Sequence, residues 1–318
     1  MSMRNSSRAG EGAGGMRGML AASVTPRRPG ESGPDLGALL EIVDFLCRAG
    51  VDGTVLFGST GEFPLFETED RARAVSLAVK RSRCPTYANV SHSMLDGAIR
   101  LAEEAASAGA AGVLVMPPIY YRYDQETIRE FMLRFLEAVG RWIPAYLYNI
   151  PAFTSAIEAP TAAELLTAGF SGIKDSSGSL EYVRTLLESP AARGKAILSG
   201  SELLCAQARP FGAAGTVSGI AACIPELLVA LERAVAAADA ASTESLLVRV
   251  REFLAWHEQF PVPMAIKEAA HIRRITPAEH AVPLGREKAR AMEEFRAWFR
   301  EWHKVVIREC GADCFSHR

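Results

Sequence analysis

A lysine stands at the end of a short apolar segment and is followed at once by small polar residues. The stretch from Gly172 to Ser177 reads G-I-K-D-S-S, with Lys174 as its last long side chain. A strand that stops at a polar turn places its final side chain at the edge of a sheet or the mouth of a barrel. There the amine loses hydration, which favours its neutral form. A neutral amine can attack a ketone and form a Schiff base.

The local sequence leaves a second interpretation of this lysine open. Lys174 could extend along the surface and pair with the neighbouring Asp175, because most lysines are hydrated surface charges. The choice depends on whether the strand is interior, and the pattern of the whole chain predicts that it is.

Eight short apolar segments alternate with helical patterns up to residue 225. The predicted strands cover residues 19–24, 53–57, 86–90, 112–116, 145–149, 170–174, 196–200 and 215–218. The predicted helices between them cover residues 36–49, 74–78, 98–108, 126–139, 161–168, 180–187 and 202–208. Strands that alternate with helices pair in parallel, and eight of them predict an α/β fold, a closed (β/α)₈ TIM barrel. An open dinucleotide-binding sheet is disfavoured because Thr25-Pro26, not G-x-G-x-x-G, follows the first strand.

Only helical patterns follow Ile224. They cover residues 225–237, 242–257, 263–275 and 286–305, and they predict the last barrel helix plus a C-terminal helical extension. We therefore divide the chain into a disordered tail at 1–15, a catalytic barrel at 16–235, an extension at 236–305 and a tail at 306–318. The first tail is rich in Gly, Ser and Arg.

Composition narrows the class of protein. The 318 residues are 49% hydrophobic and 23% charged, with a formal net charge of −2. This balance gives no reason to expect nucleic acid or an anionic membrane as a partner. No apolar stretch reaches the roughly 18 residues of a membrane-spanning helix, and no secretory signal is visible.

The six cysteines are predicted to be mostly buried, reduced thiols. Cys47, Cys84, Cys205 and Cys223 stand among apolar or small residues, which indicates a reducing, cytoplasmic location. Cys310 and Cys314 form a C-x-x-x-C pair near His303 and His317, so a metal clip in the tail stays open as a weakly supported alternative.

Polar side chains follow several of the predicted strands, where a barrel assembles its chemistry. Ser59 and Thr60 follow the second strand, Tyr120 and Tyr121 the fourth, and Tyr148 ends the fifth. Together with the lysine they supply an amine, a phenol and hydroxyl groups, the set that carbonyl chemistry through an iminium needs. These strand ends carry neither a His nor a carboxylate cluster, so we expect no metal site.

Each of these residues also has a purely structural interpretation. Ser59 or Thr60 could cap the next helix, and Tyr148 could be a core aromatic whose hydroxyl finds a partner. The tyrosine pair could lie on the surface or at a subunit contact. Their joint occurrence at successive strand ends favours the chemical interpretation.

Seven motifs in order along the chain resemble the dihydrodipicolinate synthase / N-acetylneuraminate lyase superfamily of Schiff-base-forming barrel enzymes. The resemblance spans about residues 18–300. The motifs are G-S-T-G-E at 58–62, P-P-I-Y-Y at 117–121, Y-N-I-P at 148–151, G-I-K-D-S-S at 172–177, S-G-S at 199–201, G-A-A-G-T-V-S-G at 212–219 and P-M-A-I-K at 263–267.

The resemblance implies a role for each matching residue. Lys174 would form the Schiff base with pyruvate or another 2-oxo acid, and Tyr148 would be the acid/base. Ser59 would act in the proton relay and hold the carboxylate with Thr60, and Tyr120 would reach into a neighbouring subunit's site. Further substrate contacts would come from Gly58, Gly200 and Val217. No metal or organic cofactor is implied, and the assembly would be a homotetramer, a dimer of dimers.

One position departs from the synthase pattern. Synthases of the family carry an arginine two residues after the proline of Y-N-x-P, where this chain has Phe153. An apolar wall cannot replace a bidentate carboxylate partner. We therefore expect a pyruvate-dependent aldolase or lyase that joins or cleaves pyruvate and an aldehyde, with a 2-keto-3-deoxy sugar acid as one candidate substrate. The alternatives are 4-hydroxy-tetrahydrodipicolinate synthase proper, a 2-oxo sugar acid dehydratase, and a non-catalytic barrel that senses a ligand.

Overall fold

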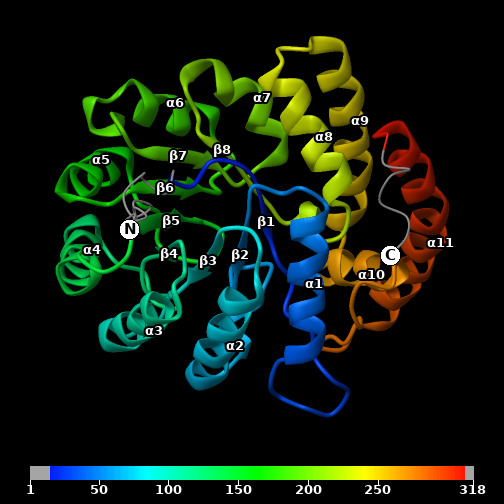
Figure 1. Ribbon diagram of the computed structural model, residues 1–318, viewed down its shortest axis with the longest axis horizontal. Coiled ribbons are helices and arrows are strands. Elements are labelled where there is room, and N and C mark those ends of the chain that lie inside the picture. The colour runs from blue at the N-terminus through cyan, green and yellow to red at the C-terminus, as the bar shows by residue number, and fades with distance from the viewer. Residues whose placement is uncertain (1–14, 312–318) are drawn as a thin grey trace, which may run out of the picture.

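A closed barrel of eight parallel strands forms the centre of the computed structural model, which describes residues 15–311 (Figure 1). The strands follow one another around the barrel in chain order, and the last pairs with the first. The predicted (β/α)₈ fold is thereby confirmed. The strands are β1 (Gly18–Ala22), β2 (Gly53–Leu56), β3 (Thr86–Asn89), β4 (Gly112–Val115), β5 (Ala145–Asn149), β6 (Gly172–Asp175), β7 (Ala196–Ser199) and β8 (Gly215–Ser218).

The strands are short and almost entirely buried, as expected where helices cover the outside of a barrel and side chains fill the inside. Large aromatic rings fill the end of the barrel opposite the predicted site. Tyr87 and Tyr146 meet edge to face, with ring centroids 5.9 Å apart, and the Tyr146 hydroxyl accepts a hydrogen bond from the Met16 amide. A Cβ at Gly112 would lie 2.8 Å from the Tyr146 ring, so this strand needs a glycine there.

Eight helices surround the barrel (Figure 1). Side chains cap several of their first turns: Asp35, Asp124 and Ser179 accept hydrogen bonds from backbone amides of the helices that they precede. The helices are α1 (Leu36–Arg48), α2 (Thr68–Arg81), α3 (Leu95–Ala108), α4 (Gln125–Val139), α5 (Ala159–Ala168), α6 (Leu180–Glu188), α7 (Cys205–Ala208) and α8 (Pro225–Ala236).

Three further helices form the extension: α9 (Ala240–His257), α10 (Met264–Ile272) and α11 (Arg286–Glu309). In Figure 1, α10 and α11 lie beside α1 and α8 on one side of the barrel. Aromatic rings hold α9 to α11, with Phe253 within 6.1 Å of both Phe295 and Phe299. The last helix runs four residues past its predicted end at 305. Most of both predicted tails, residues 1–14 and 312–318, lies outside the described residues.

One cysteine prediction is wrong. Cys47, at the end of α1, and Cys84, in the turn before β3, form a disulfide with 5.6 Å between their Cα atoms. The two are 37 residues apart in sequence, so only the packing of α1 against that turn reveals their proximity. Cys205 and Cys223 are buried free thiols, as predicted. The disulfide removes the cysteine argument for a reducing compartment, and the cytoplasmic location stays a prediction.

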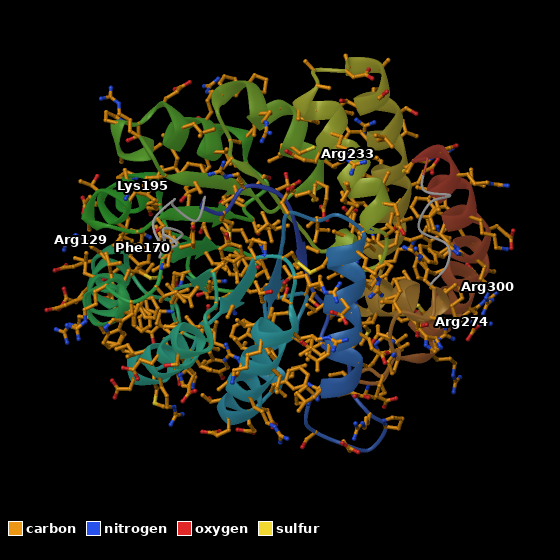
Figure 2. The ribbon with its side chains drawn as sticks, viewed as in Figure 1. Arg129, Phe170, Lys195, Arg233, Arg274 and Arg300 are labelled. Atoms are coloured by element: carbon orange, nitrogen blue, oxygen red, sulfur yellow. A yellow bond between two sulfur atoms is a disulfide. The ribbon has the colours of Figure 1, made fainter. Side chains whose placement is uncertain are left out.

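Charged side chains project from the outer helices (Figure 2). Arg129 of α4, for example, pairs at 2.8 Å with Glu164 of α5 while both stay about half exposed, an arrangement worth less than about 1 kcal/mol. Within residues 15–311, no helix is long and apolar enough to cross a membrane.

Candidate active site

Lys174 and Tyr148 lie opposite each other on neighbouring strands. The register of β5 and β6 pairs these two residues, so both side chains leave the sheet on the same side. Lys174 is 4% exposed and Tyr148 1% exposed, and the Lys174 Nζ lies 4.1 Å from the centre of the tyrosine ring. The neighbouring Asp175 instead accepts hydrogen bonds from Asn149 and Ser177. The lysine is therefore a buried amine beside a phenol and not a surface charge.

The phenol is linked in turn to a serine from across the barrel. The Tyr148 hydroxyl lies 3.0 Å from the Ser59 Oγ, in the turn after β2. Burial by itself raises the pKa of a phenol, but the charge of Lys174 and the hydrogen bond with Ser59 outweigh it and lower the pKa of Tyr148. The phenol thus lies next to the amine and is hydrogen-bonded to the serine hydroxyl.

A tight turn after β2 presents Ser59 and Thr60. The chain folds back so closely that a Cβ at Gly61 would lie 2.8 Å from the Phe57 Cα. The Thr25 hydroxyl donates to the Gly61 carbonyl at 2.8 Å and holds the turn against β1. The next residue, Glu62, adopts a left-handed backbone with φ of 53°. The close approach to Phe57 explains the glycine at position 61 of the G-S-T-G-E motif.

A cavity of about 170 Å³ contains the Lys174 side chain. It brings together most of the residues that the sequence predicts to react or to bind substrate. Gly58 and Tyr148 do not line it: Gly58 begins the turn that presents Ser59 and Thr60, and Tyr148 is buried beside Lys174. The predicted residues in its lining are Ser59, Thr60, Phe153, Lys174, Gly200 and Val217.

Tyr120 does not reach this cavity within its own chain. It lines an adjoining cavity of about 350 Å³, which shares Ser59, Phe153 and Val262 with the first. Tyr120 is 87% exposed and adopts a left-handed backbone with φ of 83°, and its ring lies edge to face against Tyr121. A bulky residue in that conformation is strained, so the loop holds this side chain outward at some energetic cost.

Three polar residues of the Lys174 cavity are not among the predicted site residues: Ser176 of the G-I-K-D-S-S motif, Glu202 and His257. Glu202 follows β7 and is 7% exposed, and its position just after S-G-S was a signal that could have found it. His257 comes from the last turn of α9, far away in the sequence, and no motif points to it. The strand ends named in the sequence analysis therefore carry no His or carboxylate cluster, but the cavity as a whole is lined by one histidine and one carboxylate.

No group of three or more His, Cys, Asp or Glu side chains that could hold a metal ion occurs between residues 15 and 311. The alternative of a metal clip in the tail is not tested, because Cys314 and His317 lie outside the described residues.

The sequence of this chain matches a known family over almost its whole length. Residues 15–300 match the model of the dihydrodipicolinate synthetase family. The chain belongs to this family. The match covers both the barrel and the helical extension, and it confirms the resemblance seen in the motifs.

Relatives of this family member carry two kinds of name. A 4-hydroxy-tetrahydrodipicolinate synthase of Thiobacillus denitrificans is 34% identical over 67% of this chain and 72% of the relative. An "uncharacterized DapA-like lyase" of Chloroflexus aurantiacus is 30% identical over 80% of this chain and 85% of the relative. The chain is therefore a lyase of the dihydrodipicolinate synthetase family, and this excludes the expectation of a non-catalytic barrel.

Solved structures support the same fold. The 4-hydroxy-tetrahydrodipicolinate synthase of Methylacidiphilum fumariolicum superposes with a TM-score of 0.85 at 25% identity, covering 93% of this chain and 98% of that one. The extension and the barrel thus occur together in the family.

Proposed function

We propose that this family member is a pyruvate-dependent aldolase in which Lys174 forms an imine with the ketone of a 2-oxo acid. One observation carries the proposal. The Lys174 amine is buried 4.1 Å from the ring of Tyr148, whose hydroxyl lies 3.0 Å from Ser59. A buried amine with an acid/base beside it is the arrangement that imine formation requires.

In the cleavage direction, the neutral Lys174 amine adds to the C2 ketone, Tyr148 gives its phenolic proton to the departing hydroxyl, and water leaves, giving a protonated imine beside a phenolate. Tyr148 accepts the proton of the C4 hydroxyl, the C3–C4 bond breaks, and its electron pair enters the imine. The products are an enamine and a free aldehyde. Protonation of C3 and hydrolysis then release pyruvate and restore the amine. The imine itself accepts the electrons, so we expect the reaction to need no metal or organic cofactor.

The donor's carboxylate would bind at the turn after β2. Ser59 and Thr60 both face the Lys174 cavity and offer hydroxyl groups on the side of the barrel opposite β6. Hydrogen bonds to a carboxylate are charge-assisted, and holding it there would present the ketone to the amine.

Trapping tests this proposal directly. Borohydride added with pyruvate is expected to leave a reduced pyruvyl group on Lys174, located by mass spectrometry of the digested protein. The variant Lys174→Ala should carry none. The Lys80→Ala variant is a useful control, because Lys80 is an exposed residue of α2 outside the cavity lining and its removal should leave the label in place. An unlabelled Lys174 in the unmodified protein would refute the proposal.

The alternative is 4-hydroxy-tetrahydrodipicolinate synthase, in which pyruvate condenses with aspartate semialdehyde, and the relatives that carry this name support it. That aldehyde carries a carboxylate, and Lys174 is the single lysine or arginine among the described residues that line the two cavities. Phe153 stands at the expected arginine position with 53% of its surface exposed. This lining favours an aldolase acting on an uncharged aldehyde. The dehydratase alternative uses the same imine and differs only in losing water.

We also propose that the active assembly is a homotetramer built from dimers. The support is Tyr120, which projects outward beside Tyr121 and does not reach the Lys174 cavity of its own chain. Two exposed tyrosines in a row are typical of a subunit interface. Size-exclusion chromatography coupled to light scattering measures the mass of the assembly.

A further inference from the structure

The Lys174 cavity contains an imidazole that no step of the proposed reaction uses. His257 ends α9, and its ring stacks on the buried Phe253 with 22° between the planes. The Nδ1 atom is enclosed without a hydrogen-bond partner among the described residues. Because Nδ1 is enclosed, Nε2 is the nitrogen that can reach a ligand in the cavity.

A carboxylate from the barrel faces the same space. One oxygen of Glu202 accepts a hydrogen bond from the Ser218 hydroxyl at 2.6 Å, and Ser218 in turn accepts one from the Ala221 amide. No side chain or amide in residues 15–311 donates to the other oxygen of Glu202. Burial lowers the pKa of His257, and the negative charge of Glu202 opposes part of that shift. The ring and the carboxylate are therefore electrostatic neighbours.

The barrel topology places Glu202 beside Lys174 and away from the proposed carboxylate site. Lys174 is on β6, and Glu202 follows the adjacent β7, whereas the donor's carboxylate would bind at the turn after β2 across the barrel. Ser59, Glu202 and His257 all line the Lys174 cavity, so the remaining carbons of a substrate held at Ser59 and bound covalently to Lys174 would share this cavity with Glu202 and His257.

We propose that Glu202 and His257 recognise a hydroxyl group on an uncharged acceptor aldehyde, an inference that rests on the proposed function. A hydroxyl can donate to the free Glu202 oxygen and accept from the His257 Nε2–H at the same time. A carboxylate has no proton to donate and would be repelled by Glu202, and an unsubstituted alkyl chain would give neither side chain a hydrogen-bond partner. The substrate class is thus a short 2-oxo acid with a hydroxyl group beyond the C4 position.

Three aldehydes that differ at one end test this inference. The condensation of pyruvate with glyceraldehyde, propanal and succinic semialdehyde is followed by mass spectrometry of the products, and kcat/KM is compared. We expect the unmodified protein to favour glyceraldehyde over propanal by at least about tenfold, because hydrogen-bonding sites reject analogues that lack the partner group. Succinic semialdehyde should be the poorest of the three.

Variants assign that preference to the two side chains. His257→Phe keeps the stack on Phe253 but removes the ring nitrogens, and Glu202→Gln removes the charge. Each should reduce the glyceraldehyde-to-propanal ratio by about tenfold, with partial recovery in Glu202→Asp. The matched control is His303→Phe in α11, where a histidine also stacks on a phenylalanine but lies outside the cavity, so the ratio should not change.

Trapping of pyruvate on Lys174 is measured in every protein and separates the two proposals. If the unmodified protein shows no trapping, the proposed function fails. Trapping together with a preference for propanal or succinic semialdehyde, or with no turnover of any aldehyde, overturns the inference alone. The inference is also overturned if pyruvate is trapped but neither His257→Phe nor Glu202→Gln changes the glyceraldehyde-to-propanal ratio. If Glu202→Gln or His257→Phe traps no pyruvate, it is replaced by Glu202→Asp or His257→Asn, respectively. The glyceraldehyde-to-propanal ratio of the replacement then tests the inference.

Discussion

The Lys267 ammonium lies 2.7 Å from a carboxylate oxygen of Glu62, and the two residues are 205 positions apart. The side chain of Lys267 is fully buried and that of Glu62 is 9% exposed. Lys267 belongs to α10 of the extension, whereas Glu62 ends the turn that presents Ser59 and Thr60. The ion pair therefore joins the extension to the part of the barrel that would hold the substrate's carboxylate.

Breaking this pair is expected to be costly. Lys267→Met should lower the free energy of unfolding by about 3–5 kcal/mol, since it leaves a carboxylate without its partner in a mostly buried site. The double variant Lys267→Met with Glu62→Gln should recover part of that loss. Urea unfolding followed by circular dichroism measures both. A single variant as stable as the unmodified protein would contradict the structural role of the pair.

Removing the phenol is expected to impair chemistry more than binding. Tyr148→Phe should lower kcat by at least about 100-fold, the usual contribution of a positioned acid/base, because no other described group joins Lys174 to Ser59. Pyruvate should still be trapped on Lys174, but more slowly. Stopped-time borohydride trapping measures the rate. Unchanged turnover in this variant would show that the proton moves by another route.

Tyr120 is expected to act in the site of a neighbouring subunit. Tyr120→Phe and Lys174→Ala should each have little activity alone, whereas co-expression of the two chains should restore it. In a mixed dimer, the subunit that keeps Lys174 would receive a tyrosine from its partner. Purification with two different tags isolates the mixed assembly. If mixing restores nothing, Tyr120 does not cross a subunit boundary.

Acid stability should depend on Glu268. Burial by itself raises the pKa of this carboxyl group, but hydrogen bonds from His280 and Arg296 and their charges outweigh burial and set the pKa at about 2. Because the folded-state pKa lies below the unfolded value of about 4.3, the stabilisation is complete above that value and is lost as the pH falls through 2. It amounts to about 3 kcal/mol at neutral pH.

The matching measurement compares unfolding free energies of the unmodified protein and Glu268→Gln at several pH values. The difference should be largest near pH 7 and should narrow steadily between pH 4 and pH 2. A difference that is the same at every pH would mean that the charge of Glu268 is not what stabilises the fold.

The disulfide should stabilise the barrel by restricting the unfolded chain. Cys47 and Cys84 close a loop of 37 residues, for which chain entropy gives up to about 4 kcal/mol. The variant Cys47→Ser with Cys84→Ser should therefore unfold at lower urea concentration, and reductant should lower the midpoint of the unmodified protein but not of the variant. Peptide mapping without reductant should recover the two cysteine peptides joined. Separate peptides would contradict the crosslink.

The barrel followed from the sequence because its signals are local. A strand buried on both faces must be a short apolar run, and a helix that covers it must repeat its apolar residues at helical spacing. The carboxyl ends of parallel strands meet at one end of a barrel, so strand-end positions alone predicted that Lys174, Tyr148 and Ser59 would lie together. The burial of Lys174 excludes a surface charge, and its role as the nucleophile stays a proposal.

Contacts between distant elements were decided only by the tertiary structure. The approach of His257 to Lys174, the pairing of Lys267 with Glu62 and the joining of Cys47 to Cys84 each depend on how whole helices pack against the barrel. Periodicity shows which face of a helix is buried but not which residue it meets. For this reason the sequence determined the fold and the place of the amine that we propose to react, whereas the second half of the cavity, and with it the proposed acceptor, came from packing.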